Sequence, residues 1–177
     1  KDVQNYCNMN LLNVTKKIKN NIFKTVNIFY ITIILIVFFL DRYSKSKIIA
    51  KFNDKQYYFN DYINFDLVWN SGIGFGLLST FSPLIYGIIT VFISLVIFFL
   101  VYLVFCSEFK FKLIFSIIIG GAIGNLYDRI VFKAVPDFID FHYQNFHWFT
   151  FNLADIFISI GVITYIFVDS IKYKKNV

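Results

Sequence analysis

The sequence predicts an all-α membrane protein with four transmembrane helices, a small extracytoplasmic β-cradle and an interfacial helix. The first observation behind this prediction is the composition: 58% of the 177 residues are hydrophobic and only 16% are charged. A soluble domain averages about 45–50% apolar and about 25% charged residues. The second observation is that the apolar residues form four long blocks, and the third is that lysines cluster beside the ends of these blocks.

Each apolar block is long enough to cross a bilayer, because a helix rises about 1.5 Å per residue and the hydrocarbon core is about 30 Å thick. We expect spans at about residues 22–40, 83–106, 111–131 and 152–171. The first block follows several lysines, as the core of a signal peptide would. No small-residue cleavage site comes after it, so we interpret it as a retained span. Residues 1–177 are therefore expected to form a single polytopic domain.

The lysines predict the orientation of the four spans. They gather in the N-terminal segment of residues 1–21 and Lys24, in the turn with Lys110 and Lys112, and in the tail that begins at Lys172. Four spans place these three segments on one side of the membrane, and the positive-inside rule makes that side cytoplasmic. Both termini are thus expected in the cytoplasm. The net charge of +6 then reflects orientation, and no nucleic-acid partner is implied.

The two outer loops are expected at residues 41–82 and 132–151, and the longer one has internal structure. Within residues 63–70, alternate positions are apolar, which predicts a strand. Gly72, Gly74 and Gly76 then end the pattern. We also expect an interfacial helix at Ser44–Phe52. At the other end of the chain, Met9 is the only methionine, and we expect the natural start there.

Four aspartates cluster at the outward ends of the spans: Asp41, Asp128, Asp137 and Asp155. A carboxylate near lipid is costly, so each needs a partner or a purpose. Two acids from different segments at the same depth can share one proton; one then polarises a carbonyl while the other activates water, without metal or cofactor. Asp137 and Asp155 meet this condition, and so do Asp41 and Asp128. The spacing does not choose between the pairs.

Other polar residues in the third span have two interpretations. Gly120 and Gly124 are spaced for close approach of a neighbouring helix, which favours a packing seam. Gly121 and Asn125 lie on one helical face, and Arg129 follows Asn125 by one turn. The amide and the guanidinium suit either that seam or binding of a substrate backbone or a carboxylate.

At the start of the fourth span, Asn152 and Asp155 are spaced as a capping box, and the spacing alone favours a cap. A helix N-terminus also favours an ionised carboxylate.

The cysteines and histidines predict no further chemistry. Cys7 and Cys106 fall on the cytoplasmic side, whereas His142 and His147 fall outside, so a Cys–His nucleophile is excluded. The histidine pair has no third ligand in its spacing and lies in an aromatic run typical of a membrane interface. We interpret the pair as structural and expect no metal.

Five motifs, in order and in register, resemble the lipoprotein signal peptidases, the signal peptidase II family of aspartyl proteases. They are Asp41-Arg-Tyr-Ser-Lys45, Asn70-Ser-Gly72-Ile-Gly-Phe-Gly76, Gly120-Gly-Ala-Ile-Gly-Asn-Leu-Tyr-Asp-Arg129, Val135-Pro-Asp-Phe138 and Phe151-Asn-Leu-Ala-Asp155. The sequence departs from the usual pattern at Arg42, where glutamine is common, at Gly74, where alanine is common, and at Pro136.

The resemblance implies cleavage of prolipoproteins before a diacylglyceryl-modified cysteine, by a cofactor-free enzyme at the outer face of the membrane that contacts lipids and acts as a monomer. It implies Asp137 and Asp155 as the catalytic pair. It also implies a supporting set: Asp41, Lys45, Asn70, Gly72, Gly121, Asn125, Arg129, Asn152 and Ala154.

Two rival classes are a small four-helix transporter and a non-enzymatic assembly factor. A transporter needs an acid near mid-membrane that lines a pathway, but Val26–Leu40 and Pro83–Cys106 carry no charge. An assembly factor gives no reason for five polar motifs at one rim.

Overall fold

The computed structural model describes residues 25–51, 57–72, 82–144 and 146–176. Four long helices dominate it: α3 (Thr25–Lys51), α4 (Pro83–Cys106), α5 (Phe109–Phe132) and α6 (Leu153–Asn176). All four are long and apolar enough to cross a membrane. The predicted fold class, four membrane helices with a small sheet, is confirmed. The expected start at Met9, the segment of residues 1–21, Gly74 and Gly76 lie outside the described residues.

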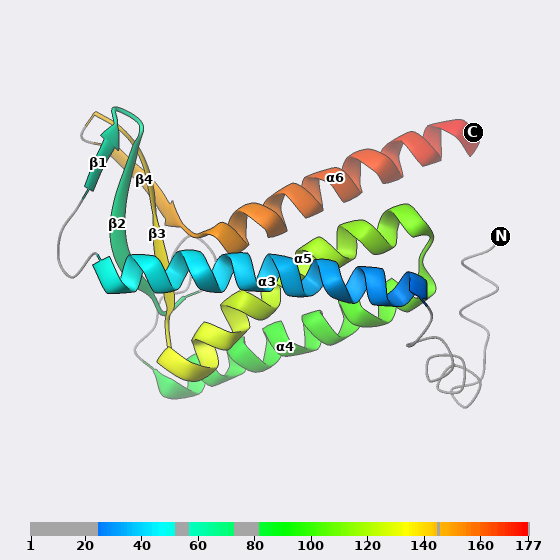
Figure 1. Ribbon diagram of the computed structural model, residues 1–177, viewed down its shortest axis with the longest axis horizontal. Helices are drawn as coiled ribbons and strands as arrows, with labels where there is room; N and C mark the ends of the chain where they lie inside the picture. Colours follow the sequence, from blue (N-terminus) through cyan, green and yellow to red (C-terminus); the bar gives the residue numbers. More distant parts are fainter. Residues whose placement is uncertain (1–24, 52–56, 73–81, 145, 177) are drawn as a thin grey trace.

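Helix α5 is the centre of the bundle, because it packs against α3, α4 and α6 (Figure 1). Its glycines allow the close approach that the sequence predicts. A Cβ on Gly120 would lie 2.7 Å from Val37 Cβ of α3, and one on Gly121 would lie 2.8 Å from Ala154 O of α6. In contrast, α4 leaves Phe92, Leu95 and Phe98 exposed, as expected for a helix solvated by lipid tails.

A four-stranded antiparallel sheet covers one end of the bundle, with the strand order β1-β2-β3-β4 (Figure 1). The strands are β1 (Tyr57–Asn60), β2 (Ile63–Asn70), β3 (Val135–Tyr143) and β4 (Phe146–Phe151). The alternating pattern predicts β2. It does not predict β3 and β4, because β3 buries both aspartates and apolar residues, and β4 is a run of aromatic residues without a clear alternation.

Helix α3 is longer than expected and continues through Asp41 to Lys51. Residues 41–51 of the expected outer loop are therefore helical. The expected interfacial helix at Ser44–Phe52 is helical as far as Lys51, but it forms the last turns of α3. The physical reason is that Asp41 and Lys45 lie one turn apart and pair with each other at 2.9 Å, so the charged turn is buried without breaking the helix.

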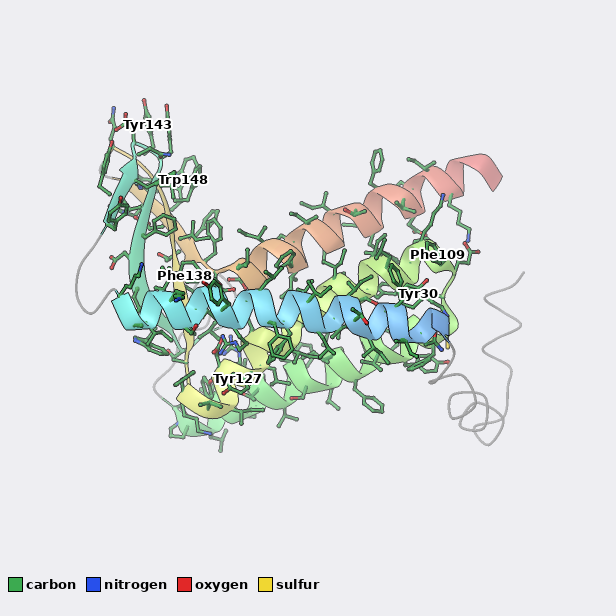
Figure 2. All side chains as sticks on the ribbon, viewed as in Figure 1. Tyr30, Phe109, Tyr127, Phe138, Tyr143 and Trp148 are labelled. Carbon is green, nitrogen blue, oxygen red and sulfur yellow. The ribbon has the colours of Figure 1, made fainter. Side chains whose placement is uncertain are left out.

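Contacts at the other end of the bundle join the start of α3, the α4–α5 turn and the end of α6. Tyr30 donates a hydrogen bond to Phe109 O at 3.4 Å, and Lys172 pairs with Glu108 at 2.8 Å. Figure 2 shows Tyr30 and Phe109 at this end, with Tyr143 and Trp148 at the far end in the sheet. The start of α3, the turn with Lys110 and Lys112, and Lys172 near the end of α6 therefore share one end, and the sheet lies at the opposite one.

Candidate active site

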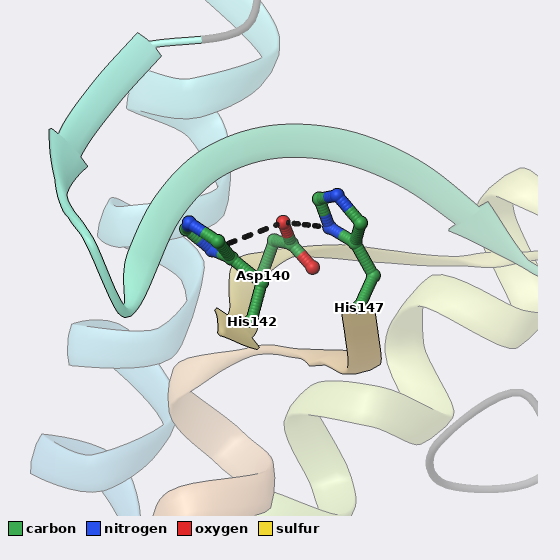
Figure 3. A group of neighbouring side chains, drawn as sticks. All are labelled: Asp140, His142 and His147. Carbon is green, nitrogen blue, oxygen red and sulfur yellow. Dashed lines mark hydrogen bonds and ion pairs between the residues drawn. The ribbon is translucent and has the colours of Figure 1, made fainter. Parts of the chain in front are cut away.

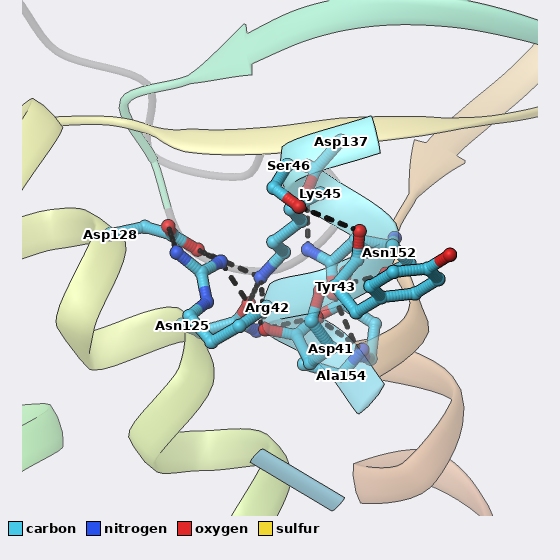
Figure 4. A network of polar contacts seen from close by, with 12 residues as sticks. Asp41, Arg42, Tyr43, Lys45, Ser46, Asn125, Asp128, Asp137, Asn152 and Ala154 are labelled. Atoms are coloured by element: carbon cyan, nitrogen blue, oxygen red, sulfur yellow. Dashed lines mark hydrogen bonds and ion pairs between the residues drawn. The ribbon is translucent and has the colours of Figure 1, made fainter. Parts of the chain in front are cut away.

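The four aspartates meet where the sheet joins the helix ends. Asp41 comes from α3, Asp128 from the last turns of α5, Asp137 from β3 and Asp155 from the first turn of α6. The first three are 2% exposed or less. Three helices and one strand thus deliver carboxylates to one buried region (Figure 4).

Asp41 and Asp128 form an ion-pair network with Lys45. The Lys45 ammonium is fully buried and donates to Asp41 Oδ2 at 2.9 Å, to Asp128 Oδ2 at 2.8 Å and to Asn125 Oδ1 at 2.7 Å (Figure 4). All three protons of an ammonium are therefore used. Asp41 accepts a further bond from the backbone N–H of Ala154, 3.1 Å away, which attaches α6 to α3.

Arg42 adds a second cation to the Asp128 side of this network. Its Nη2 donates to Asp128 Oδ2 at 2.8 Å and lies 3.4 Å from Asp41 Oδ2. Its guanidinium also lies 4.9 Å from the centre of the Tyr127 ring, a cation–π distance. Asp41 and Asp128 thus share two cations, which compensate a negative charge buried in the fold.

Asp137 has a different environment, because both of its carboxylate oxygens accept from neutral amides. Asn152 Nδ2 donates to Oδ1 at 2.6 Å, and Asn70 Nδ2 donates to Oδ2 at 2.8 Å. Burial, followed by the negative charge of Asp155, raises the pKa of Asp137 from its usual 3.8 to about 7, although the two amides act in the opposite direction. Asp137 can therefore hold a proton near neutral pH.

Asp155 also accepts only uncharged donors. Asn125 Nδ2 donates to its Oδ1 at 2.9 Å, and the backbone N–H of Asn152 donates to its Oδ2 at 3.1 Å. In return, Asn152 Oδ1 accepts the backbone N–H of Asp155 at 3.1 Å. This reciprocal pair confirms the predicted capping box. The cap uses only Asp155 Oδ2, so Oδ1, which accepts from Asn125, can also take part in the site.

Two asparagines connect the charged network to the uncharged pair. Asn125 accepts from Lys45 and donates to Asp155, so its amide orientation is fixed from both sides. Asn152 donates its side-chain amide to Asp137 and its backbone N–H to Asp155. Hydrogen bonds thus link the Asp41–Lys45–Asp128 network to the second pair of acids through amide groups, and the Lys45 charge also acts on that pair through space.

Arg129 and Gly72 form the edge of the site beside β2. Arg129 is 4% exposed, and its Nη2 donates to Gly72 O. The backbone N–H of Gly72 in turn donates to Asn70 Oδ1 at 2.8 Å. Arg129 Nε and Nη1 are buried and have no hydrogen-bond partner within the described parts of the chain. The Arg129 guanidinium therefore lies at the end of β2, and two of its N–H groups have no partner among the described residues.

A groove of about 700 Å³ opens next to Arg129, between α4 and the end of α5. Its wall includes Pro83, Gly87, Val91 and Ile130 and is largely apolar. None of the four aspartates lines it. The groove therefore lies beside Arg129 and is separate from the acids.

All eleven residues singled out in the sequence lie in or against this region, with Gly121 contributing close helix packing. Two further residues, Asp128 and Arg42, also belong to this region. Asp128 is one of the four clustered aspartates and Arg42 departs from the family pattern, but the resemblance includes neither in the supporting set. Their role depends on pairing across α3 and α5. One feature of the sequence does indicate such pairing: an unpaired charge at the end of a membrane span is energetically unfavourable, so it needs a partner.

The structure adds a neighbour to the histidine pair that its spacing in the sequence does not show. The pair has a third potential ligand, because Asp140 of β3 lies beside both rings, with its Oδ2 2.7 Å from His147 Nδ1 (Figure 3). The spacing of the two histidines could not reveal this, because strand pairing brings the three side chains together.

Four helices able to cross a membrane, with buried aspartates gathered at one end beneath a small sheet, fit the class of membrane-embedded aspartyl enzymes. The family model described as signal peptidase (SPase) II matches residues 33–171. Two similar proteins are each named lipoprotein signal peptidase. That of Pelagibacter ubique (strain HTCC1062) is 44% identical over 142 residues, which cover 78% of this chain and 86% of that protein. That of Anaplasma phagocytophilum (strain HZ) is 40% identical over 144 residues, which cover 77% and 88%.

A solved structure agrees with these sequence matches. It is described as a bacterial membrane enzyme determined by the in meso method at 2.3 Å resolution, and it is 29% identical with a TM-score of 0.66. The match covers 83% of this chain and 90% of that one. The chain belongs to the signal peptidase II family, and it is a protease.

Proposed function

We propose that this enzyme removes signal peptides from prolipoproteins by cleaving before a diacylglyceryl-modified cysteine, with Asp137 and Asp155 as the catalytic pair. One observation carries the choice of pair. Within the described residues, no lysine, arginine or histidine lies within ion-pair distance of Asp137 or Asp155, whereas Asp41 and Asp128 bind two cations. Acids without a cation can share a proton, while ion-paired acids are held charged.

The two environments suggest which acid carries the proton. The raised pKa of Asp137, about 7, favours its protonated form, and the helix N-terminus of α6 favours an ionised Asp155. Asp155 then takes a proton from a water molecule, whose oxygen adds to the scissile carbonyl carbon. Asp137 gives its proton to the carbonyl oxygen. Collapse of the resulting diol breaks the C–N bond as the leaving amine gains a proton, and the pair returns to one shared proton.

Neighbouring groups support binding of a lipidated peptide. The two unused donors of Arg129 suit a peptide carbonyl near the end of β2. The apolar groove beside Arg129 lies between membrane helices and suits an acyl chain. A single chain carries all these groups, and we propose that the enzyme acts as a monomer. The lysine-bearing end supports cytoplasmic termini, which places the acids at the outer face of a bacterial inner membrane.

The test uses the full chain, purified in detergent and incubated with a diacylglyceryl-modified prolipoprotein. Asp137→Asn and Asp155→Asn should each reduce cleavage at least about a thousandfold, because neither variant can share a proton between two carboxylates. Asp61→Asn is the matched control: it changes an exposed aspartate of the same sheet, and it should cleave normally. Unfolding temperatures establish that all three variants are folded. Normal cleavage by either of the first two would refute the pair.

A second substrate separates the lipid requirement from the chemistry. The same prolipoprotein without the diacylglyceryl group should be cleaved poorly by the wild type. Equal cleavage of both forms would contradict recognition of the lipid but leave the aspartate assignment standing.

A further inference from the structure

A second cluster of titratable groups lies in the sheet, apart from the four aspartates of the site. It consists of Asp140 and His142 on β3 and His147 on β4 (Figure 3). Their ligand atoms all lie within 4.8 Å of one another. Asp140 is 4% exposed and His142 is 6% exposed, whereas the His147 side chain is half exposed. The cluster is therefore buried on one side and open on the other.

Strand pairing fixes these three side chains on one face of the sheet. His142 and His147 are direct partners in the β3–β4 register, and Asp140 lies two residues before His142 on the same strand. The two imidazole rings stack with their centres 5.2 Å apart. The backbone N–H of His142 also donates to Tyr62 O at 2.9 Å, which ties this end of β3 to the β1–β2 turn. The backbone, more than flexible side chains, holds the arrangement.

His142 carries the observation that points to a ligand. Its Nδ1 is buried and has no hydrogen-bond partner in the described parts of the chain; the Asp140 carboxylate lies 3.7 Å away. That distance is too long for a hydrogen bond, and a buried polar atom without a partner is costly. An additional atom between Nδ1 and the carboxylate would satisfy both.

Asn64 of β2 provides a second unsatisfied atom beside the same ring. Its Nδ2 lies 3.5 Å from His142 Nε2, and its Oδ1 is buried without a partner. The two ends of an amide have nearly the same shape, and rotating it by half a turn exchanges them. His142 Nε2–H then donates to Asn64 Oδ1, which leaves a lone pair on Nδ1. Metal-binding histidines generally donate their other ring N–H in this way.

We propose that Asp140, His142 and His147 bind one divalent transition-metal ion, of which Zn²⁺ is the type. Zinc binds imidazole nitrogens and carboxylate oxygens at about 2.0–2.2 Å, which separates tetrahedral ligand atoms by about 3.3 Å. The observed separations of 2.7 Å and 3.7 Å from Asp140 Oδ2 lie on either side of that value, so side-chain shifts of less than about 1 Å assemble the site. The exposed side of His147 leaves the fourth position to water.

The metal would take the place of the hydrogen bond between His147 Nδ1 and Asp140, and the imidazole proton of His147 would move to its exposed Nε2. The ion would connect β3 to β4, and Asn64 of β2 would hold the His142 ring in place through its hydrogen bond to Nε2. Asp137 lies three residues before Asp140 on β3, so the site would stiffen the strand that carries one of the proposed catalytic acids. This proposal replaces the expectation that no metal binds. A plain His147–Asp140 hydrogen bond leaves His142 Nδ1 and Asn64 Oδ1 unexplained.

The test is a titration of the full chain with ZnCl₂ by isothermal calorimetry. The protein is purified in detergent through a tag without histidine and is treated first with a chelator. We expect one ion per chain with a dissociation constant below about 10 μM, and an increase in unfolding temperature of about 5 °C at saturation. Co²⁺ in place of Zn²⁺ should give the visible absorption of a tetrahedral site.

His147→Ala removes one ligand at a half-exposed position and should weaken Zn²⁺ binding at least about a hundredfold while the protein stays folded. Asp61→Asn, an exposed carboxylate of the same sheet, is the control and should bind Zn²⁺ as the wild type does. Asp137→Asn should also retain binding, which separates this proposal from the assignment of the catalytic pair. No saturable binding by the wild type, or unchanged binding by His147→Ala, would overturn it.

Discussion

Two pairs of buried aspartates lie side by side in this protein and have opposite environments. Asp41 and Asp128 face the Lys45 ammonium and the Arg42 guanidinium. Asp137 and Asp155 accept hydrogen bonds only from amides and a backbone N–H. The same residue type at the same end of the helices is thus paired with cations in one pair and hydrogen-bonded to uncharged donors in the other. Both pairs are buried, so the neighbouring cations distinguish the first pair from the second.

The two pairs also differ in what they contribute to the fold. Removing a cation from the first pair leaves buried charge without compensation, which is strongly destabilising. Removing an acid from the second pair relieves repulsion between like charges, so it should affect chemistry more than stability. The following variants and conditions test this contrast.

The largest effect on stability is expected from Lys45→Met, which keeps the length of the side chain but removes the buried cation. Asp41 and Asp128 then lose their shared partner, and we expect a loss of about 3–5 kcal/mol in the free energy of unfolding. Thermal or denaturant unfolding in detergent measures it. Lys47→Met is the control, because Lys47 is exposed and should change the free energy by less than about 0.5 kcal/mol. Equal losses in the two variants would refute the structural role of the first pair.

Gly124→Ala tests how tightly α5 approaches the first pair. A Cβ at this position would overlap the Asp41 carboxylate, and the Asp41 Cγ would lie 3.1 Å away. We expect a loss of about 1–3 kcal/mol, because the ion-pair network must move. Gly87→Ala, where a Cβ meets nothing within 4 Å, is the helical control for unfolding. If both substitutions leave the free energy of unfolding unchanged, close packing against α5 does not hold Asp41 in place.

The pH dependence of cleavage tests the second pair. The pKa of Asp137 is raised from 3.8 to about 7, so the folded protein keeps a proton here that the unfolded chain loses above pH 4. The shared proton is present below about pH 7 and is lost as the pH rises through that value. We therefore expect kcat to fall about tenfold per pH unit on the alkaline side. A rate that is flat from pH 6 to 9, with the protein folded throughout, would contradict a protonated Asp137.

The same titration affects stability in the same direction. A carboxyl whose pKa is higher in the folded state binds its proton more tightly there, so the free energy of unfolding falls as the pH rises from about 4 to about 7. Asp137→Asn should remove this slope. Unfolding curves of the variant and the wild type across that range make the comparison.

The smallest effect is expected from Arg42→Gln. Arg42 is partly exposed, with 17% of its side chain accessible, and Lys45 still neutralises Asp128 in the variant. We expect a loss of about 1 kcal/mol or less and little change in cleavage. A loss of free energy of unfolding as large as that of Lys45→Met would show that Arg42 is the principal counter-ion of Asp128, which contradicts the role given to Lys45.

The helices follow from the sequence to a large extent, and their ends do not. Blocks of apolar residues predict all four helices, because a membrane span must satisfy its own backbone hydrogen bonds. The extension of α3 to Lys51 was missed because Asp41, Arg42 and Lys45 look like the start of a polar loop. Their partners lie on α5 and α6, more than 80 residues away in the chain, and only the packed bundle brings them into reach.

The choice between the two acid pairs likewise depends partly on the sequence and partly on the tertiary structure. The sequence by itself determined that four aspartates gather at one rim, that Asn152 and Asp155 cap a helix, and that five motifs match a protease family. It left two pairs equivalent, because spacing carries no information about which cations a carboxylate meets. Only the tertiary structure places Lys45 and Arg42 against Asp41 and Asp128 and surrounds Asp137 with amides. It likewise brings Asp140 to His142 and His147, because strand pairing joins positions whose separation along the chain has no fixed relation to their distance in space.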